Sequence, residues 1–323
     1  MPDRSTGGSG GAGATGDRST GGPGGAESTG DRSTGTGPQT EWRRAVVGSK
    51  RAVANAPVLA FVLLTFTYTW TIDGITLIAF ESPSELHGLP RVWGPLVAAV
   101  VVVWTLDGDV RSFVGHVRNV RVGVRWYALA FALPPVLTDV EALLSLGLGA
   151  DVGFEPTAPL ALYLLNFLLV LFLAGGLEEF GWRGFAQSRL QGPHGALAAA
   201  IVVGLLWSSW HLPLFLWYEL AAYDPATLHV YYLTTVAQSV VFAWLYNSTD
   251  GGLLVVMIAH AAGNLPPFLV VTGETPGLVA TLPVRELTYV AVALVVVVYA
   301  GSRTLSRDDE LPPVAGLRTT DAD

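Results

Sequence analysis

Long apolar segments recur along the whole chain, and they limit the kind of fold that it can adopt. The 323 residues are 51% hydrophobic and only 14% charged, whereas a soluble domain carries about 25% charged residues. A helix of about 20 apolar residues crosses the hydrocarbon core of a bilayer and satisfies its own backbone hydrogen bonds there. The sequence therefore predicts an all-α, polytopic integral membrane protein.

We expect about eight transmembrane helices. The predicted spans are residues 53–73, 91–106, 126–147, 160–180, 197–217, 229–247, 251–270 and 286–301. Residues 1–40 have almost no large apolar side chain and repeat the tetrapeptide D-R-S-T, a pattern typical of a disordered low-complexity tail. The chain then divides into this tail, a membrane domain at 41–305 and a short polar C-terminal tail at 306–323.

Lysine and arginine are distributed unevenly between the predicted loops. They gather before the first span, between the second and third spans, and after the fourth and eighth spans: Arg43, Arg44, Lys50, Arg51, Arg111, Arg118, Arg121, Arg125, Arg183, Arg189, Arg303 and Arg307. The alternate loops carry little beyond Arg91 and Arg285. Because positively charged loops stay in the cytoplasm, we expect a multi-pass cell-membrane protein with both termini cytoplasmic.

Two features of the composition exclude whole classes of function. The chain contains no cysteine, which removes thiolate metal ligands and cysteine nucleophiles. Its net charge is −8, and it shows no basic surface of the kind that binds nucleic acids. The partners that remain are the lipid bilayer and a substrate or ligand within it.

Three polar motifs lie in or beside the apolar spans. Glu178 and Glu179 follow a nearly uninterrupted apolar run, and Arg183 comes four residues later. The second motif is W-S-S-W-H at 207–211, and the third is H-A-A-G-N at 260–264. An ionisable group inside a membrane is costly and usually serves a function, so these motifs are the candidate functional site.

Helical spacing relates the motif residues to one another. Glu179 and Arg183 are four residues apart and can pair on one helical face, while Glu178 points elsewhere. His260 and Asn264 also share a face. Each motif alone has a structural explanation, such as an interfacial helix cap. Together they would leave several polar groups in lipid unless the groups converge in one cavity, which is what we expect.

The depths of His211 and Glu178 in the membrane set a condition on the length of the fourth helix. His211 lies about 14 residues from the cytoplasmic end of its predicted span, or about 21 Å. Glu178 lies near the cytoplasmic end of the fourth span as predicted. The two can meet if the fourth helix continues towards Leu190, and we expect this continuation, with a water-filled cavity that opens to the cytoplasm. Asp73 is interpreted as a residue that ends the first span.

The motifs resemble those of a known family. The pattern E-E-x-x-x-R at 178–183, an aromatic residue four before His at 207–211, and His-x-x-x-Asn at 260–264 occur in this order on successive helices. They are similar to the CPBP family of intramembrane proteases, which includes CAAX prenyl endopeptidases and bacterial proteins of bacteriocin processing and self-immunity. The resemblance covers residues 160–270. It departs from the family pattern at position 207, where Trp replaces the common Phe.

The resemblance implies a glutamate-dependent intramembrane endopeptidase that needs no cofactor. Glu178 would activate the attacking water, and His211 would help to orient or deprotonate it. His260 and Asn264 would stabilise the oxyanion. Two further residues would support the site: Glu179 and Arg183. The substrate would be a membrane-associated or lipidated peptide.

Three other functions are compatible with the same residues. A zinc-dependent protease could use Glu178, His211 and His260 as ligands, although the chain has no H-E-x-x-H motif. A membrane binding or immunity protein could hold a partner without cleaving it. A transporter could use Glu178 as a proton site, but the two halves of the sequence show no convincing internal repeat.

Overall fold

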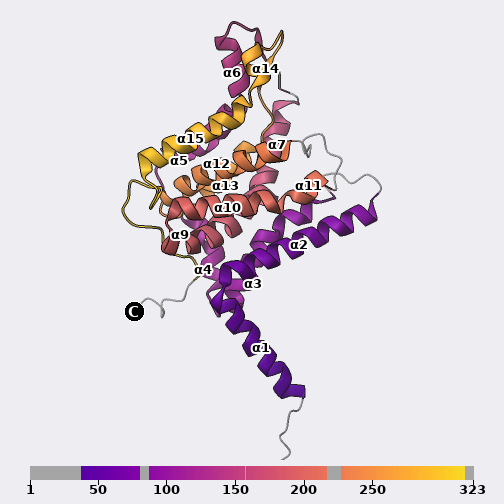
Figure 1. Cartoon of the computed structure of the whole chain (residues 1–323), viewed down its shortest axis with the longest axis vertical. Helices are drawn as coiled ribbons and strands as arrows, with labels where there is room; N and C mark the ends of the chain where they lie inside the picture. The colour runs from indigo at the N-terminus through magenta and orange to yellow at the C-terminus, as the bar shows by residue number, and fades with distance from the viewer. Residues whose placement is uncertain (1–37, 81–86, 157, 217–226, 317–323) are drawn as a thin grey trace, which may run out of the picture. The chain divides into compact units, whose positions relative to one another are not determined.

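The computed structural model describes residues 38–80, 87–156, 158–216 and 227–316 (Figure 1). The first half contains α1 (Pro38–Asn55), α2 (Pro57–Ala79), η1 (Leu89–Trp93), α3 (Gly94–Thr105), α4 (Val110–Gly115), η2 (His116–Arg118), α5 (Val124–Thr138), α6 (Val140–Gly147) and β1 (Val152–Phe154). The second contains α7 (Leu160–Leu173), α8 (Gly175–Glu179), η3 (Phe180–Gln187), α9 (Ser188–His194), α10 (Ala196–Trp210), α11 (Leu212–Leu216), α12 (Leu228–Asn247), α13 (Leu253–Gly263), β2 (Leu269–Val271), α14 (Gly277–Thr281) and α15 (Val284–Ala300). The described residues from Val46 onwards form one compact unit, which contains the helical body and the cavity.

The helical fold class is confirmed, since helices form most of the described chain and the strands are limited to β1 and β2. Three helical runs are long and apolar enough to cross a membrane: Pro57–Ala79, Leu160–His194 and Leu228–Asn247. A fourth crossing is formed if α5 and α6, bent by 63° at their junction, count as one span. The remaining apolar helices are shorter. The structure thus supports a polytopic helical membrane protein with three or four clear crossings among the described residues.

The predicted extension of the fourth span is confirmed. Leu160–His194 forms one helical run of 35 residues, interrupted at Ala174 by a non-helical residue with φ −129° and ψ −122°. After α8 the run continues as the π-helix η3. π-Helical segments are rare and are frequently found at functional sites. The extension leaves Glu178 and Glu179 in the middle of the helical run, within the apolar body.

Small residues let the helices around this run approach closely. A side-chain carbon on Gly181 would lie 2.5 Å from Pro95, and one on Gly204 would lie 2.8 Å from the Val236 backbone. Membrane helices use such positions because close backbone contact replaces the hydrophobic driving force that is lost in lipid. The polar side chains of neighbouring helices can therefore meet in the interior.

The connecting segments gather at two ends of the helical body. One end, here called the basic end, consists of residues 106–123, 189–196, 248–252 and 301–316. These segments are joined by hydrogen bonds from Asn119 to the Asp250 carbonyl and from the Asp109 amide to the Gly316 carbonyl. The opposite end consists of residues 87–93, 139–156, 211–216 and 264–276, and there β1 pairs antiparallel with β2. Figure 1 shows α10 running from α9 to α11, from one end to the other.

The predicted tails fall partly outside the described residues. The D-R-S-T repeats of the N-terminal tail lie there, as do residues 317–323. The described part of the C-terminal tail is attached to the helical body, where the Arg189 guanidinium donates to the Ala315 carbonyl at 3.4 Å. Ala315 also packs against the main apolar core.

The interpretation of Asp73 as the end of the first span is wrong. Helix α2 continues to Ala79, and Asp73 is fully buried within it. An ionised carboxylate at such a position requires a partner. Arg91 of η1 supplies it, with its Nε 2.8 Å from Asp73 Oδ1.

Candidate active site

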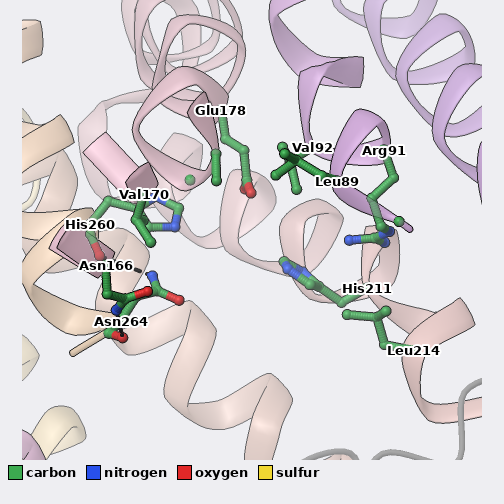
Figure 2. A pocket seen from close by; sticks show the side chains of 13 residues that line it. Leu89, Arg91, Val92, Asn166, Val170, Glu178, His211, Leu214, His260 and Asn264 are labelled. Carbon is green, nitrogen blue, oxygen red and sulfur yellow. Dashed lines mark hydrogen bonds between the residues drawn. The ribbon is translucent and has the colours of Figure 1, made fainter. Parts of the chain in front are cut away.

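A single cavity of about 270 Å³ brings the predicted catalytic residues together (Figure 2). Its lining comes from η1, α7, α8, α10, α11 and α13: Gly88, Leu89, Arg91, Val92, Asn166, Val170, Ala174, Gly175, Glu178, His211, Leu214, His260 and Asn264. Glu178 and His260 are almost fully buried, whereas Asn264 is exposed. The cavity therefore has Glu178 and His260 in its interior and Asn264 at its mouth.

Glu178 is held by a tryptophan of the second motif. Its Oε2 accepts a hydrogen bond from Trp207 Nε1 at 2.9 Å, and Figure 2 shows the carboxylate pointing into the cavity. A phenylalanine, the residue common at this position in the CPBP pattern, could not donate this bond. The departure at position 207 thus adds a contact that fixes the carboxylate.

Glu179, Arg183 and His260 form a buried polar group behind the cavity. Arg183 Nη1 lies 3.0 Å from the Glu179 carboxylate, as the spacing of four residues predicts. His260 Nδ1 lies 2.6 Å from Glu179 Oε1. The Arg183 guanidinium also stacks over Trp207 at 4.6 Å. Each charged group has a partner, which a buried ion pair requires, and Glu179 fixes the orientation of the His260 ring.

His211 ends α10 and presents one nitrogen to the cavity. Its Nδ1 lies 2.9 Å from the Trp207 carbonyl oxygen. A carbonyl oxygen accepts hydrogen bonds only, so Nδ1 carries the proton, and in the neutral ring Nε2 carries a free electron pair. The ring of Trp210 packs edge-on against His211 at 4.6 Å. His211 is thereby fixed in the tautomer that can accept a proton from water.

Asn264 follows the last residue of α13 and is held from both sides. Its Nδ2 donates to the His260 carbonyl at 3.0 Å. Asn166 Nδ2 donates to the Asn264 carbonyl at 3.1 Å, so this neighbouring helix fixes the backbone at the end of α13. A side-chain amide has two N–H donors, and the second donor of Asn264 remains for a group in the cavity.

Arg91 is a cavity residue that the sequence motifs do not reveal. Its place in the sequence predicts the lone arginine of a loop, yet Arg91 lines the cavity and is 5% exposed. Its guanidinium lies 4.5 Å from the Trp210 ring. One signal in the sequence could have found it, since a buried Asp73 within an apolar helix needs a cation nearby.

The residues proposed as alternative zinc ligands line the cavity without forming a cluster. Among the described residues, no group of three His, Asp or Glu side chains lies close enough to hold a metal ion. The Nδ1 atoms of His260 and His211 are engaged by Glu179 and by the Trp207 carbonyl, which leaves both Nε2 atoms available. In this conformation, however, the side chains do not lie close enough together to hold one zinc ion.

Gly175 is required for the position of His260. A side-chain carbon at Gly175 would overlap the His260 ring at Nε2. We expect Gly175→Ala to displace the ring and to lower hydrolysis about 10²-fold, the effect of a misplacement of about 1 Å. Thermal unfolding and hydrolysis of the purified variant would measure this. Gly263→Ala is the control, since its new carbon would make an ordinary contact with Pro134 at 3.5 Å; equal activity of the two variants would contradict the prediction.

Part of the chain is similar in sequence to known membrane endopeptidases. Residues 160–266 match the sequence model of a family described as type II CAAX prenyl endopeptidase Rce1-like. The chain is also 22% identical over 230 residues to CAAX prenyl protease 2 of Methanococcus maripaludis, which covers 68% of this chain and 82% of that protein. The matched region includes all three motifs. Over the region that carries the three motifs, the chain is therefore similar to CAAX prenyl endopeptidases, and this similarity indicates a membrane-embedded peptidase.

Proposed function

We propose that the protein is a glutamate-dependent endopeptidase that hydrolyses membrane-associated or lipidated peptides. The observation that carries the proposal is the convergence of Glu178, His211, His260 and Asn264 on one cavity within an apolar body. Hydrolysis of an amide needs a base, a positioned water and donors for the tetrahedral oxygen. The cavity supplies a residue for each of these requirements.

The proposed reaction begins at Glu178. Its carboxylate removes a proton from a water molecule that His211 Nε2 orients, and the water oxygen attacks the peptide carbonyl carbon. The carbonyl oxygen becomes an oxyanion, which accepts hydrogen bonds from Asn264 and His260. Glu178 then gives the proton to the leaving nitrogen as the C–N bond breaks, so the carboxylate is restored and one water is consumed.

The contact with Glu179 sets a condition on His260. A neutral ring that donates from Nδ1 to Glu179 has an unprotonated Nε2, which cannot donate to an oxyanion. The proposed role therefore requires His260 to carry protons on both nitrogens when the oxyanion forms. Asn264 donates under any conditions, because a side-chain amide does not titrate near neutral pH.

Removal of the Asn264 donor provides a direct test of its proposed role. We expect Asn264→Ala to lower kcat by about 10²–10³-fold, the usual effect of deleting one oxyanion donor. KM should change little, because the donor acts mainly in the transition state. Steady-state kinetics of purified protein would measure both constants. Activity near that of the wild type would remove Asn264 from the oxyanion role.

The experiment that tests the proposed function needs no assumption about the substrate. New protein termini would be compared in host membranes that carry either the wild-type chain or Glu178→Gln at equal abundance. Termini that depend on Glu178 would establish proteolysis and identify substrates. Identical termini in both membranes would overturn the proposal and favour a binding or immunity protein.

A chelator distinguishes the zinc-dependent alternative. Loss of Glu178-dependent cleavage in the presence of a chelator, with recovery on addition of zinc, would establish a metalloprotease. We propose that cleavage continues without metal, because Glu178, His211 and His260 do not lie close enough together among the described residues to hold one ion.

We also propose the arrangement of the chain in the membrane. The arginines of the basic end, including Arg111, Arg118 and Arg303, favour a cytoplasmic location for that end and for both termini. The three shorter apolar segments Leu89–Thr105, Ala196–Trp210 and Leu253–Gly263, with α15, would complete the eight crossings. The tail at 1–40 would be disordered.

A further inference from the structure

Four buried polar side chains follow one another at a spacing of four residues along the helical run that carries the site. They are Glu179, Arg183, Gln187 and Gln191, and each is at most 1% exposed. Such a spacing places side chains one above another on a single helical face. These four residues are here called the polar column. The proposed site includes Glu179 and Arg183, whereas Gln187 and Gln191 continue from it towards the basic end.

The polar column connects the catalytic cavity with a second cavity. At one end, Glu179 contacts His260, which lines the catalytic cavity. At the other end, Gln191 lines a cavity of about 640 Å³ at the basic end. The lining of this second cavity includes the exposed residues His194 and Arg303, so water from outside the helical body can enter it.

Hydrogen bonds within the polar column leave several buried atoms without a partner. Gln187 Nε2 donates to Gln191 Oε1 at 3.1 Å, and Asn247 Nδ2 donates to the same oxygen at 3.0 Å. Arg183 Nη1 donates to Glu179 at 3.0 Å. The atoms that remain unpaired among the described residues are Arg183 Nε and Nη2, Gln187 Oε1, Gln191 Nε2 and Asn247 Oδ1. Donors and acceptors therefore both remain along the polar column, and Arg183 makes no direct hydrogen bond to Gln187.

This combination of unpaired atoms is suited to water. A buried polar atom without a hydrogen bond is costly, and proteins satisfy such atoms with ordered buried water that makes two to four hydrogen bonds. A water molecule can accept from the Arg183 guanidinium and donate to Gln187 Oε1, which neither side chain can do for itself. A second water can accept from Gln191 Nε2 on the side of the basic-end cavity.

We propose that the polar column holds a chain of water molecules, and that this chain carries protons between the basic-end cavity and His260. The inference rests on the proposed function, which requires His260 to be protonated on both nitrogens. A proton that reaches the Glu179 carboxylate crosses the 2.6 Å contact to Nδ1 of a ring that already holds a proton on Nε2. The product is a doubly protonated ring beside an ionised Glu179, and the proton can return by the same path.

The path matters while a substrate is bound. The catalytic cavity has a volume of about 270 Å³, near the lower limit for ligand pockets of about 300 Å³, so a bound peptide fills it and separates His260 from the water at its mouth. The polar column stays in contact with water at the basic end. The charged and titratable groups around the ring are Glu178, Glu179, Arg183 and His211. Of these, Glu179 alone both contacts the ring and belongs to the polar column.

An experimental structure of the full chain tests the water chain without any cleavage. At a resolution that shows ordered water, we expect water within hydrogen-bond distance of Arg183 Nε or Nη2, of Gln187 Oε1 and of Gln191 Nε2. Direct pairing of these atoms with protein groups, with no water between them, would overturn the proposal.

Sealed lipid vesicles test the proton path. A peptide substrate identified by its Glu178-dependent termini is added outside, so only protein with its cavity mouth outwards reacts, and the basic end of that protein faces the interior. With the external pH held constant, we expect a fall of the internal pH from about 8 to about 6 to raise the rate by about 10-fold, because one titrating group changes its protonated fraction by at most about tenfold per pH unit. A wild-type rate that ignores the internal pH would overturn the proton path and leave the proteolytic function intact.

A substitution within the polar column connects the response to the proposed path. Gln187→Met fills a similar space without a polar atom, so it should remove the response to the internal pH, while cleavage persists and thermal unfolding shows a folded protein. Gln238→Met is the matched control, because this glutamine lies on α12 outside the polar column, and it should respond like the wild type. A response retained in Gln187→Met would overturn the path. Absence of any Glu178-dependent cleavage would overturn the proposed function instead, and the ordered water in the structure would then decide the water chain alone.

Discussion

Replacement of Glu178 by glutamine should lower kcat/KM by at least about 10⁴-fold and leave the protein folded. Loss of one member of a catalytic group that acts as a unit typically has an effect of this size. Glutamine has the shape of glutamate and can still accept the hydrogen bond from Trp207, but it cannot take a proton from water. The comparison requires kinetics and thermal unfolding of both purified proteins.

The control for this prediction is a glutamate outside the cavity. Glu155 follows β1 and is exposed, so Glu155→Gln should retain normal hydrolysis and stability. More than a hundredth of the wild-type activity in Glu178→Gln, with the same cleavage position, would show that another group activates the water.

Replacement of Arg183 by methionine should destabilise the protein by about 3–5 kcal/mol, the usual effect of breaking a buried ion pair. Arg183 and Glu179 have no exposed side-chain surface. The change removes the cation that balances Glu179 and leaves the buried carboxylate with His260 alone. Thermal unfolding in detergent and the yield of folded protein would measure the loss.

Two further variants define the cause of this loss. The double change Glu179→Gln with Arg183→Met removes both charges and should recover most of the stability, because no buried ion remains without a partner. The double variant should nevertheless lack hydrolytic activity, because His260 loses the carboxylate that orients it. Lys50→Met is the surface control: Lys50 pairs with Asp107 at 2.9 Å in an exposed position, where an ion pair contributes about 0–1 kcal/mol. A similar loss in Lys50→Met and Arg183→Met would contradict the argument.

Much of the site could be predicted because its relations are local. The spacing of four residues places Arg183 beside Glu179 on any helix, and the order of the three motifs identified the residues that line the cavity. The apolar segments located the helices, although the seventh ends at Gly263, earlier than hydropathy suggests. There the chain turns to form β2, a tertiary pairing with β1 that no helical period encodes.

The pair of Asp73 and Arg91 could not be read in the same way. The two residues lie in different elements, separated by 18 positions, and no periodic pattern connects them. Aspartate is a residue type common at helix ends, and arginine is one common in loops, so the sequence alone places Asp73 and Arg91 in those positions. Their contact depends on how η1 packs against α2, which is a consequence of tertiary structure. The bond from Trp207 to Glu178 is of the same kind, since it joins α10 to α8.

The end of the helical body at which the cavity lies determines from which side of the membrane a substrate can enter it. The sequence predicts a cavity open to the cytoplasm, but the lining of the cavity comes from the start of η1, from α11 and from the residue after α13. All of these lie at the end opposite to the basic end. With the basic end in the cytoplasm, the protein would take its peptides from the outer leaflet and release the products outside the cell. Both termini of the chain would then be on the other side of the membrane from its chemistry.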